Sequence, residues 1–330
     1  MSKVTILGSG TWGTALANLL ASKNEDVTLY SRFQEEAERY AATRVHPHLP
    51  NAKIDERIRF SYKLDEALLG AEYVVFACPS PYIRETARRV APYAKKDMIM
   101  ITVAKGIEAK THMTMSEIIQ DELGPEYKVA ALSGPTHAEE VSLLMPTVIV
   151  SACEDEETAK KVQSLFATPY MRVYINKDIR GVELCGALKN IIALAAGIGD
   201  GLGFGDNCKA ATITRGLAEM TRLGVAMGCN PLTFSGLAGI GDIVVTATSR
   251  HSRNNNAGRL LGQGKSLEET LKEIGMVVEG INALVAAKEL SQEYHVEMPI
   301  VDAVYAAVYE GVKPLDAVNA LFARGLKSEV

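Results

Sequence analysis

The stretch Val4–Leu20, VTILGSGTWGTALANLL, joins a strand pattern, a glycine motif and a helix pattern without interruption. The run VTIL predicts a strand, and Gly8, Gly10 and Gly13 then have the GxGxxG spacing that opens a helix in dinucleotide-binding proteins. Gly8 permits the tight turn, Gly10 lets a pyrophosphate approach the backbone, and Gly13 allows close packing of helix on strand. The helix N-terminus offers its free N–H groups to the phosphates. The stretch therefore predicts a nucleotide-binding α/β domain.

The end of the second predicted strand, DVTLYSR at Asp26–Arg32, bears on which nucleotide binds. NAD-specific proteins place Asp or Glu there, against the ribose 2′-hydroxyl. This chain has Ser31 and Arg32, and a guanidinium can pair with a 2′-phosphate. We therefore expect NADP(H) to be favoured over NAD(H). A flavin or S-adenosylmethionine remains an alternative ligand for the glycine turn, and a solvated surface arginine is the alternative for Arg32.

Strand and helix patterns alternate through the first half of the chain. Further strands are predicted at YVVFACP, MIMITVAKG, VAALSGP, TVIVSA and MRVYI, with amphipathic helical patterns among them. Near residue 178 the strand patterns stop, and long helical patterns such as Lys209–Gly228 and Ile281–His295 follow. We expect an α/β fold in which a doubly wound Rossmann-type domain, residues 1–178, precedes an all-α domain, residues 179–330.

Composition excludes several classes of function. The net charge of −5 provides no positive surface for nucleic acid or anionic lipid. The apolar run Asn190–Gly203 is interrupted by Asp200 and is shorter than the ~18 residues that predict a membrane span. The five cysteines are scattered without a CxxC pair, and the histidines lack metal-ligand spacing. We expect a cytoplasmic protein with no metal, no nucleic acid partner and no membrane segment.

Two lysines occur where a ligand could explain them. Lys189, followed by Asn190, interrupts a helical pattern that is otherwise apolar, just before a cluster of glycines. A buried cation either extends to the surface or meets something anionic or reactive. Lys105 follows a predicted parallel strand at its carboxyl end, where ligands bind in open α/β sheets, although a surface lysine at the start of a loop is an equal alternative.

A polar cluster in the second half suits a phosphate. Asp242 and Thr246 are four residues apart and would share one face of a helix. Ser252, Arg253 and Asn254 then combine a hydroxyl, a guanidinium and an amide, and arginine can bind phosphate through two hydrogen bonds. A solvated loop is the alternative interpretation. His137 has no recognisable catalytic partner in the sequence, and we expect it to be structural or to cap the following turn.

An ordered set of motifs over nearly the whole chain resembles the bacterial-type NAD(P)-dependent glycerol-3-phosphate dehydrogenases. The motifs are GSGTWGTALA, VAKGIE, SGPTHAEEV, GVELCGALKNIIALAAGIGDGLGFGDN, TRGLAEM, NPLTFSGLAGIGDIVVTATSRHSRN and GMVVEG. The resemblance implies a cytoplasmic enzyme that reduces dihydroxyacetone phosphate with NADP(H) or NAD(H) to sn-glycerol 3-phosphate, the backbone precursor of phospholipids. Helical second domains of such enzymes often form homodimers.

The resemblance also implies roles for individual residues. The catalytic acid/base is Lys189. The substrate-binding positions are Lys105, Gly134, Thr136, Lys189, Asp242, Ser252, Arg253 and Asn254. The cofactor-binding positions, including the three glycines of the motif, are Gly8, Gly10, Thr11, Trp12, Gly13, Arg32, Phe33, Lys105, Ala138, Arg253, Val277 and Glu279. Thr11 and Thr136 stand where the family often has serine, and each keeps the hydroxyl; Phe33 falls where the family varies.

Two other functions remain open from the residues themselves. A related two-domain dehydrogenase of a hydroxy acid or ketopantoate would present a carboxylate, which Arg253 could also bind. A non-catalytic NADP(H)-sensing protein would use the N-terminal domain alone. Comparing the turnover of dihydroxyacetone phosphate with that of ketopantoate distinguishes the first alternative from a glycerol-3-phosphate dehydrogenase. An absence of any turnover would favour the second alternative.

Overall fold

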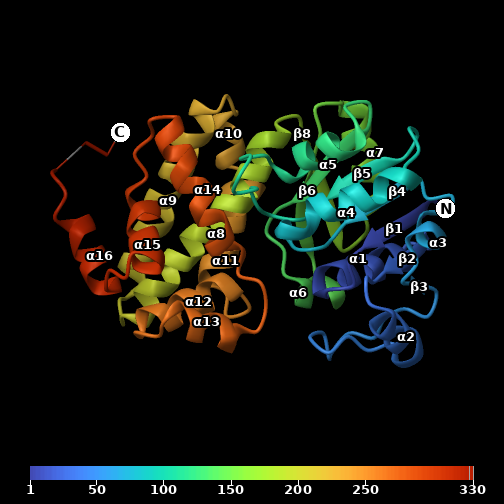
Figure 1. Cartoon of the computed structure of the whole chain (residues 1–330), viewed down its shortest axis with the longest axis horizontal. Coiled ribbons are helices and arrows are strands. Elements are labelled where there is room, and N and C mark those ends of the chain that lie inside the picture. Colours follow the sequence, from blue (N-terminus) through green and yellow to red (C-terminus); the bar gives the residue numbers. More distant parts are fainter. Residues whose placement is uncertain (327, 330) are drawn as a thin grey trace. The chain divides into compact units, whose positions relative to one another are not determined.

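A computed structural model describes residues 1–326, 328 and 329, and its contacts divide the chain into two units (Figure 1). The α/β unit comprises Met1–Lys105 and Met113–Glu183. The helical unit comprises Gly106–His112 and the chain from Leu184 onward. An α/β domain followed by an all-helical one confirms the fold class expected from the sequence.

One eight-stranded sheet forms the centre of the α/β unit, in the order β3-β2-β1-β4-β5-β6-β7-β8. The strands are β1 Lys3–Leu7, β2 Asp26–Tyr30, β3 Arg59–Ser61, β4 Tyr73–Phe76, β5 Ile99–Thr102, β6 Lys128–Ser133, β7 Thr147–Ala152 and β8 Met171–Asn176. The first six have the order typical of dinucleotide-binding sheets, in which the strand order reverses beside β1. The carboxyl ends of β1 and β4 therefore mark the expected ligand side.

The sheet differs from the sequence-based expectation in two places. Strand β3 is only three residues long, too short for its alternation to stand out, and it pairs with β2 at the sheet edge. Strand β7 runs antiparallel to β6, whereas β8 is parallel to β7. An apolar run shows that a strand is buried on both faces but carries no information on its direction.

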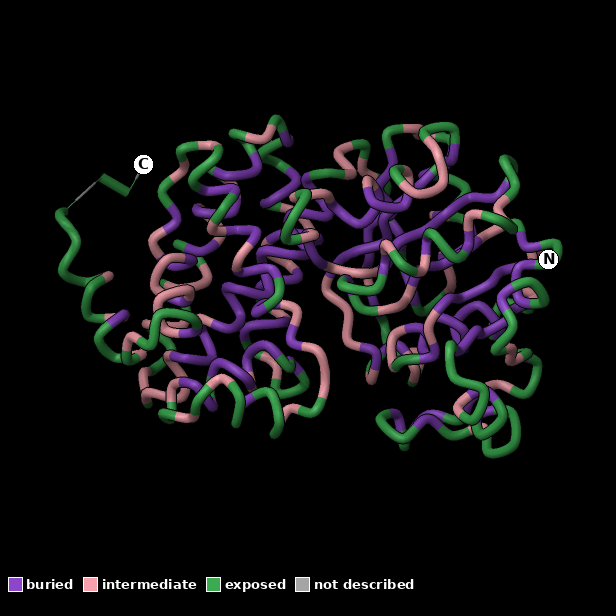
Figure 2. The backbone as a smooth tube through the Cα atoms, in the orientation of Figure 1, coloured by how far each residue is buried: buried purple, intermediate pink, exposed green. Residues whose placement is uncertain are grey.

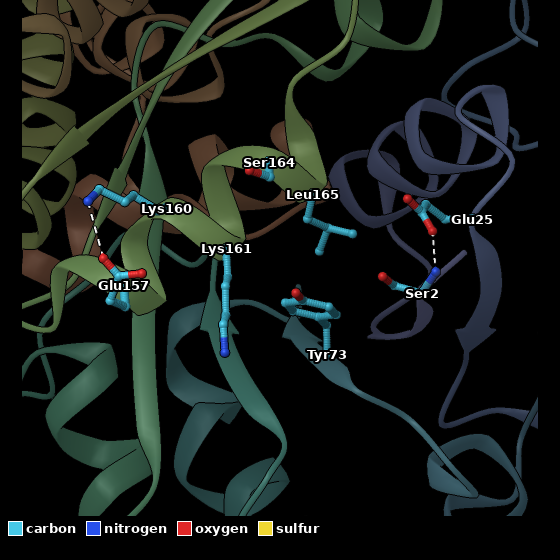
Figure 3. A pocket seen from close by; sticks show the side chains of 8 residues that line it. All are labelled: Ser2, Glu25, Tyr73, Glu157, Lys160, Lys161, Ser164 and Leu165. Carbon is cyan, nitrogen blue, oxygen red and sulfur yellow. Dashed lines mark hydrogen bonds and ion pairs between the residues drawn. The ribbon is translucent and has the colours of Figure 1, made fainter.

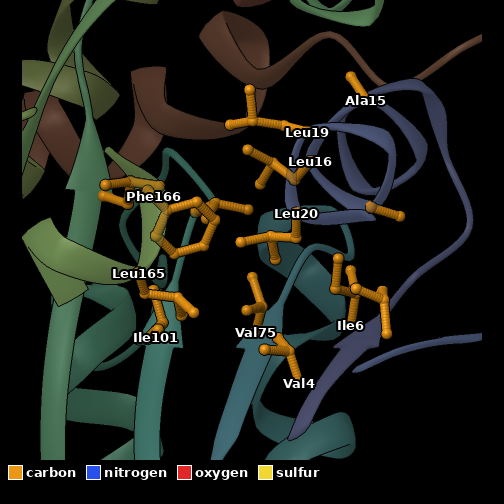
Figure 4. Packing of buried hydrophobic residues seen from close by; sticks show 14 of the residues in the cluster. Val4, Ile6, Ala15, Leu16, Leu19, Leu20, Val75, Ile101, Leu165 and Phe166 are labelled. Atoms are coloured by element: carbon orange, nitrogen blue, oxygen red, sulfur yellow. The ribbon is translucent and has the colours of Figure 1, made fainter. Parts of the chain in front are cut away.

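Helices cover both faces of the sheet and produce two separate cores. They are α1 Thr11–Ser22, α2 Gln34–Thr43, α3 Leu64–Leu68, α4 Ile83–Val90, α5 Met115–Leu123, α6 Ala138–Ser142 and α7 Glu156–Phe166. Figure 4 shows Ile6 of β1 near Leu20 of α1, with Phe166 of α7 packed in the same cluster. Leu7, the next residue of β1, belongs to the other core, against α4 and α5. This alternation follows the two-residue period of a strand.

The helical unit is built around α8, Ile179–Gly201. The other helical elements are α9 Asp206–Ala226, α10 Pro231–Phe234, the π-helical segment η3 Leu237–Gly241, α11 Asp242–Thr248, α12 Arg253–Gly262, α13 Leu267–Ile274, α14 Glu279–Glu293, α15 Pro299–Tyr309 and α16 Pro314–Phe322. Figure 2 shows the continuous burial along α8. Two stretches, α8 and Pro231–Thr248, have the length and apolar composition of a membrane span. Within the most apolar 18 residues of each, 94% and 44% are buried inside the structure. Burial of this extent in α8 is typical of a core helix.

Gly197, Gly199 and Gly201 lie within α8, whereas Gly203, with a φ of +81°, and Gly205, the N-cap of α9, lie in the turn that follows. Gly197 and Gly201 face Gly258 and Gly262 of α12, and the two glycines of each pair are four positions apart in the sequence. A Cβ added at any of the four would overlap a backbone atom of the opposite helix. The two backbones therefore pack directly on each other, as small residues at this spacing permit.

Two buried glutamates cap the N-termini of helices in their own units: Glu183 caps α5, and Glu219 caps α15. Glu183 accepts hydrogen bonds from the Ser116 amide at 2.9 Å and the Ser116 hydroxyl at 2.5 Å, in the first turn of α5. Glu219 accepts from the amides of Ile300 and Val301 at 2.8 and 3.3 Å, in the first turn of α15. Each carboxylate thus satisfies amides that have no partner within their own helix. Burial nevertheless raises the pKa of each carboxyl to about 7.

The raised pKa of Glu183 predicts a pH-dependent stability. Because its folded pKa of about 7 exceeds the ordinary value of 4.5, the stability present below pH 4.5 is lost as the pH rises through 7. We expect the melting temperature to fall between about pH 5 and pH 8 in the wild type and less in Glu183→Gln. Over this pH range the free energy of unfolding of Glu183→Gln should rise relative to that of the wild type by up to about 3 kcal/mol. Thermal unfolding across this range measures it, with exposed Glu154→Gln as control; equal slopes for Glu183→Gln and wild type would contradict the assignment.

Candidate active site and cofactor site

The glycine loop has the shape of a phosphate cradle. Gly8 has a φ of +127°, and a Cβ there would lie 2.8 Å from the backbone of Ala77. A Cβ at Gly13 would overlap the carbonyl oxygen of Gly8. A Cβ at Gly10 would meet no heavy atom within 4 Å, so the loop is open at that point. Thr11 and Trp12 form the first turn of α1, where amides lack intrahelical partners. An open loop above these amides fits the diphosphate of a dinucleotide.

Arg32 and Phe33, which follow β2, lie at the surface beside the glycine loop. The amide of Gly8 donates to the carbonyl of Tyr30 at 3.0 Å, so the end of β2 lies directly beside the glycine loop. Arg32 forms an ion pair with Glu85 at 3.1 Å, and both side chains are about half exposed. Phe33 precedes α2 and is 67% exposed. Neither Arg32 nor Phe33 is rigidly fixed by packing.

Three of the expected substrate residues converge at the carboxyl ends of β5 and β6. The Nζ of Lys105 donates to the carbonyl of Gly134 at 3.0 Å, and the Thr136 hydroxyl donates to the same oxygen at 3.2 Å. Ala138 follows as the first residue of α6. His137 occupies the N-cap position of α6, as the sequence suggested, but its side chain makes no capping hydrogen bond.

Lys189 is buried and lies against α11. Its Nζ donates to the Asp242 carboxylate at 2.9 Å and to the Thr246 hydroxyl at 2.6 Å. The Thr246 hydroxyl donates in turn to the Asp242 carbonyl at 2.6 Å. The side chains of Lys189 and Asp242 are only 8% and 1% exposed. The spacing of Asp242 and Thr246 thus places both on one helical face, as expected, and the carboxylate compensates a buried positive charge.

The start of α12 gathers a second group of expected residues. Ser252 is its N-cap and accepts a hydrogen bond from the Asn255 amide at 3.2 Å. Exposed Arg253 donates to the carbonyl of Val277 at 3.0 Å. Asn254 is buried: it donates to the Asn190 side chain at 2.9 Å and accepts from the Gly280 amide at 2.9 Å. Its amide group therefore joins α8, α12 and α14, whose first residue is Glu279.

Asn190 has a structural role that no local pattern in the sequence indicates. It bonds to Asn254 and directly follows Lys189, so the Lys189 group and the α12 terminus are linked through adjacent residues of α8. The four-residue glycine spacing in α8 and α12 was the available signal for their close contact. No local pattern identified Glu183 or Glu219 as helix caps, because their partners are far away in the sequence.

A separate cavity of about 320 Å³ lies at the amino-terminal ends of the strands, opposite the glycine loop (Figure 3). Ser2, Glu25 and Tyr73 line it near the starts of strands, together with Glu157, Lys160, Lys161, Ser164 and Leu165 of α7. Ligands of open α/β sheets bind at the carboxyl ends instead. Within the described part of the chain, no three His, Cys, Asp or Glu side chains group closely enough to hold a metal ion.

Comparisons with known proteins agree over the whole chain. The family described as NAD-dependent glycerol-3-phosphate dehydrogenase matches residues 3–159 by its N-terminal part and residues 178–319 by its C-terminal part. The NAD(P)+ glycerol-3-phosphate dehydrogenase 2 of Lactobacillus delbrueckii subsp. bulgaricus is 51% identical, with 100% of this chain and 99% of the relative covered. The Pelotomaculum thermopropionicum enzyme of the same description is 48% identical, covering 99% and 95%. The crystal structure of glycerol-3-phosphate dehydrogenase from Coxiella burnetii superimposes with a TM-score of 0.94 at 36% identity, covering 98% and 99%.

The glycine loop generates a paired prediction. Gly10→Ala should leave the melting temperature nearly unchanged, because its Cβ meets open space, yet weaken NADPH binding by about tenfold or more, because the methyl occupies the cradle. Gly13→Ala should lower both binding and melting temperature, because its Cβ overlaps the Gly8 carbonyl. Fluorescence titration and thermal unfolding measure the two effects. Unweakened binding by Gly10→Ala would show that the diphosphate lies elsewhere.

Proposed function

The chain belongs to the NAD-dependent glycerol-3-phosphate dehydrogenase family, and from that premise we propose how its residues carry out the reaction. The enzyme interconverts dihydroxyacetone phosphate and glycerol 3-phosphate with NAD(P). Glycerol 3-phosphate is the backbone of glycerophospholipids, so the activity is consistent with phospholipid biosynthesis. The buried group formed by Lys189, Asp242 and Thr246 carries our assignment of roles.

Lys189 is the proposed acid/base. The nicotinamide, when bound, supplies the hydride that the carbonyl carbon receives, and negative charge then develops on the ketone oxygen. The Lys189 ammonium stabilises that charge and donates the proton that completes the alcohol; in the reverse direction the amine accepts it. Asp242 and Thr246 hold Nζ by hydrogen bonds of 2.9 and 2.6 Å, so the ammonium needs little reorganisation during the reaction.

The start of α12 is the proposed phosphate site. A helix N-terminus attracts an anion, and here it carries the hydroxyl of Ser252 and the guanidinium of Arg253. Arg253 is exposed and donates to the carbonyl of Val277, a contact that it can exchange for a phosphate by turning its guanidinium. Asn254 fixes the turn through its bonds to Asn190 and Gly280. Lys105, with Gly134 and Thr136, is the proposed substrate contact of the α/β unit.

The proposed cofactor site begins at the glycine loop. Gly8, Gly10 and Gly13 shape the cradle for the diphosphate, which the amides of the first turn of α1 approach. The remaining proposed contacts lie at the starts of α1, α6, α12 and α14 and after the ends of β2 and β5. They are Thr11, Trp12, Arg32, Phe33, Lys105, Ala138, Arg253, Val277 and Glu279.

We also propose that the enzyme works in the cytoplasm as a homodimer. The scattered cysteines and the absence of paired CxxC spacing support a reducing compartment. The helical unit exposes large apolar side chains, among them Leu232 of α10 and Phe322 of α16, which are 75% and 79% exposed and which association with a second copy could cover.

Lys189→Met tests the catalytic assignment. We expect kcat to fall by at least about 100-fold, because the variant cannot supply the proton or the charge. The Kd for NADPH should stay nearly unchanged, because the proposed cofactor contacts do not include Lys189. Lys209→Met is the matched control: this lysine pairs with Asp200 at 3.0 Å in the same unit and should keep kcat. Near-normal kcat in Lys189→Met would refute the role.

Arg253→Ala tests the phosphate site. We expect the KM for dihydroxyacetone phosphate to rise by about tenfold or more, with a smaller change in kcat, because the phosphate does not react. Arg259→Ala, an exposed arginine in the last turn of the same helix, is the control. Steady-state kinetics at saturating NADPH measure both, and an unchanged KM in Arg253→Ala would remove Arg253 from the phosphate site.

A further inference from the structure

Glu36 lies close to the position where a ribose-binding acid is expected. The hydrogen bond from the Gly8 amide to the Tyr30 carbonyl puts the end of β2 beside the glycine loop. NAD-specific proteins place their Asp or Glu at this point. The residues at that point are Ser31, Arg32 and Phe33, so the strand end itself carries no acid. The first turn of α2 follows immediately and contains Glu36.

The Glu36 carboxylate contacts both the end of β2 and the glycine loop. Its Oε2 accepts a hydrogen bond from the hydroxyl of Ser31 at the end of β2, at 2.5 Å. The same oxygen accepts from the hydroxyl of Ser9, within the glycine loop itself. Its Oε1 accepts from the Tyr40 hydroxyl at 3.2 Å. The carboxylate is therefore held between the two segments that meet the adenosine ribose in a dinucleotide-binding fold.

The hydrogen bonds leave this carboxylate with capacity for one more donor. A carboxylate offers about four acceptor positions, two on each oxygen. Oε2 uses two for the serines, whereas Oε1 uses one for Tyr40. Ser9 and Ser31 are only 5% and 2% exposed, which fixes the orientation, while Glu36 itself is partly exposed. Oε1 can thus accept from a hydroxyl that arrives at the loop.

We propose that Glu36 determines cofactor specificity by accepting the ribose 2′-hydroxyl of NAD(H) and repelling the 2′-phosphate of NADP(H). A hydroxyl can donate to Oε1, whereas a phosphate brings a second negative charge without a donor. This inference rests on the use of NAD(P) by the enzyme and concerns the choice between the two forms. It assigns to α2 the acid that the end of β2 lacks.

Arg32 opposes Glu36 in this choice. Its ion pair with Glu85 is about half exposed on both sides, and pairs of that kind are weak enough for the guanidinium to turn toward a 2′-phosphate. The specificity of the chain is then the balance of one attractive and one repulsive charge at the same ribose position. The acid lowers the NADP(H) preference that Arg32 alone would produce.

Glu36→Gln tests the proposal by direct binding. Gln keeps an acceptor oxygen for the serines and removes the charge. Fluorescence titration of NADPH and NADH should show the Kd for NADPH falling by about tenfold, with the Kd for NADH unchanged or raised by a few fold. Glu35→Gln is the matched control, because Glu35 is an exposed neighbour in the same turn; its ratio of the two Kd values should stay at the wild-type value.

A ratio that does not move in Glu36→Gln, or equal weakening of both cofactors, would overturn the proposal and leave Glu36 a purely structural residue. Arg32→Ala gives a second test with Glu36 intact, in case Glu36→Gln fails to fold. With only the repulsive charge left, NADPH should bind at least about tenfold more weakly than NADH. Equal affinities in Arg32→Ala would refute the repulsion. Turnover of dihydroxyacetone phosphate by the wild type tests the enzyme's function separately from these binding measurements.

Discussion

Lys189 can hold a charge inside the helical unit because the Asp242 carboxylate lies 2.9 Å from its Nζ. Removing two charges from water is costly, so such a pair requires hydrogen bonds that satisfy the remaining groups, and Thr246 supplies one. The pair also constrains the backbone: α8 and α11 must keep the register at which lysine, aspartate and threonine meet. The π-helical segment Leu237–Gly241 lies directly before Asp242, and such segments are frequent at functional sites.

The glycine contact between α8 and α12 extends this constraint to the proposed phosphate site. With Gly197 and Gly201 against Gly258 and Gly262, the helices approach to backbone distance and cannot rotate independently. The bonds of Asn190 to Asn254 and of Asn254 to Gly280 then fix the start of α12 relative to α8 and α14. One helix therefore carries the proposed proton donor, Lys189, and also orients the segment that bears Arg253. Adjacent polar residues of α8 thus differ in role: Lys189 is the proposed acid/base, whereas Asn190 holds the start of α12 through Asn254.

The α/β unit shows a comparable division at the end of β2. Arg32 is loosely held at the surface, whereas Glu36 is anchored by two nearly buried serine hydroxyls. If both charges meet the ribose as proposed, one fixed and one loosely held charge of opposite sign let the site accept both forms of the nucleotide, with a preference set by a small energy difference. Relatives described as NAD(P)+ enzymes accord with such a site.

Local patterns in the sequence determined the classes of structure and singled out the candidate reacting group, Lys189. The glycine spacing after VTIL predicted the dinucleotide fold, the loss of strand patterns near residue 178 predicted the helical second half, and Lys189 was conspicuous as a charge in an apolar helix. Tertiary structure decided which partners those groups have. Asp242 and Thr246 reach Lys189 across 53 and 57 residues, and the direction of β7, the carboxylate caps of Glu183 and Glu219, and the return of Glu36 to Ser9 depend on distant segments meeting. Periodicity records whether a residue is buried, because burial follows from its own element, but the identity of its neighbour is set only when the elements pack.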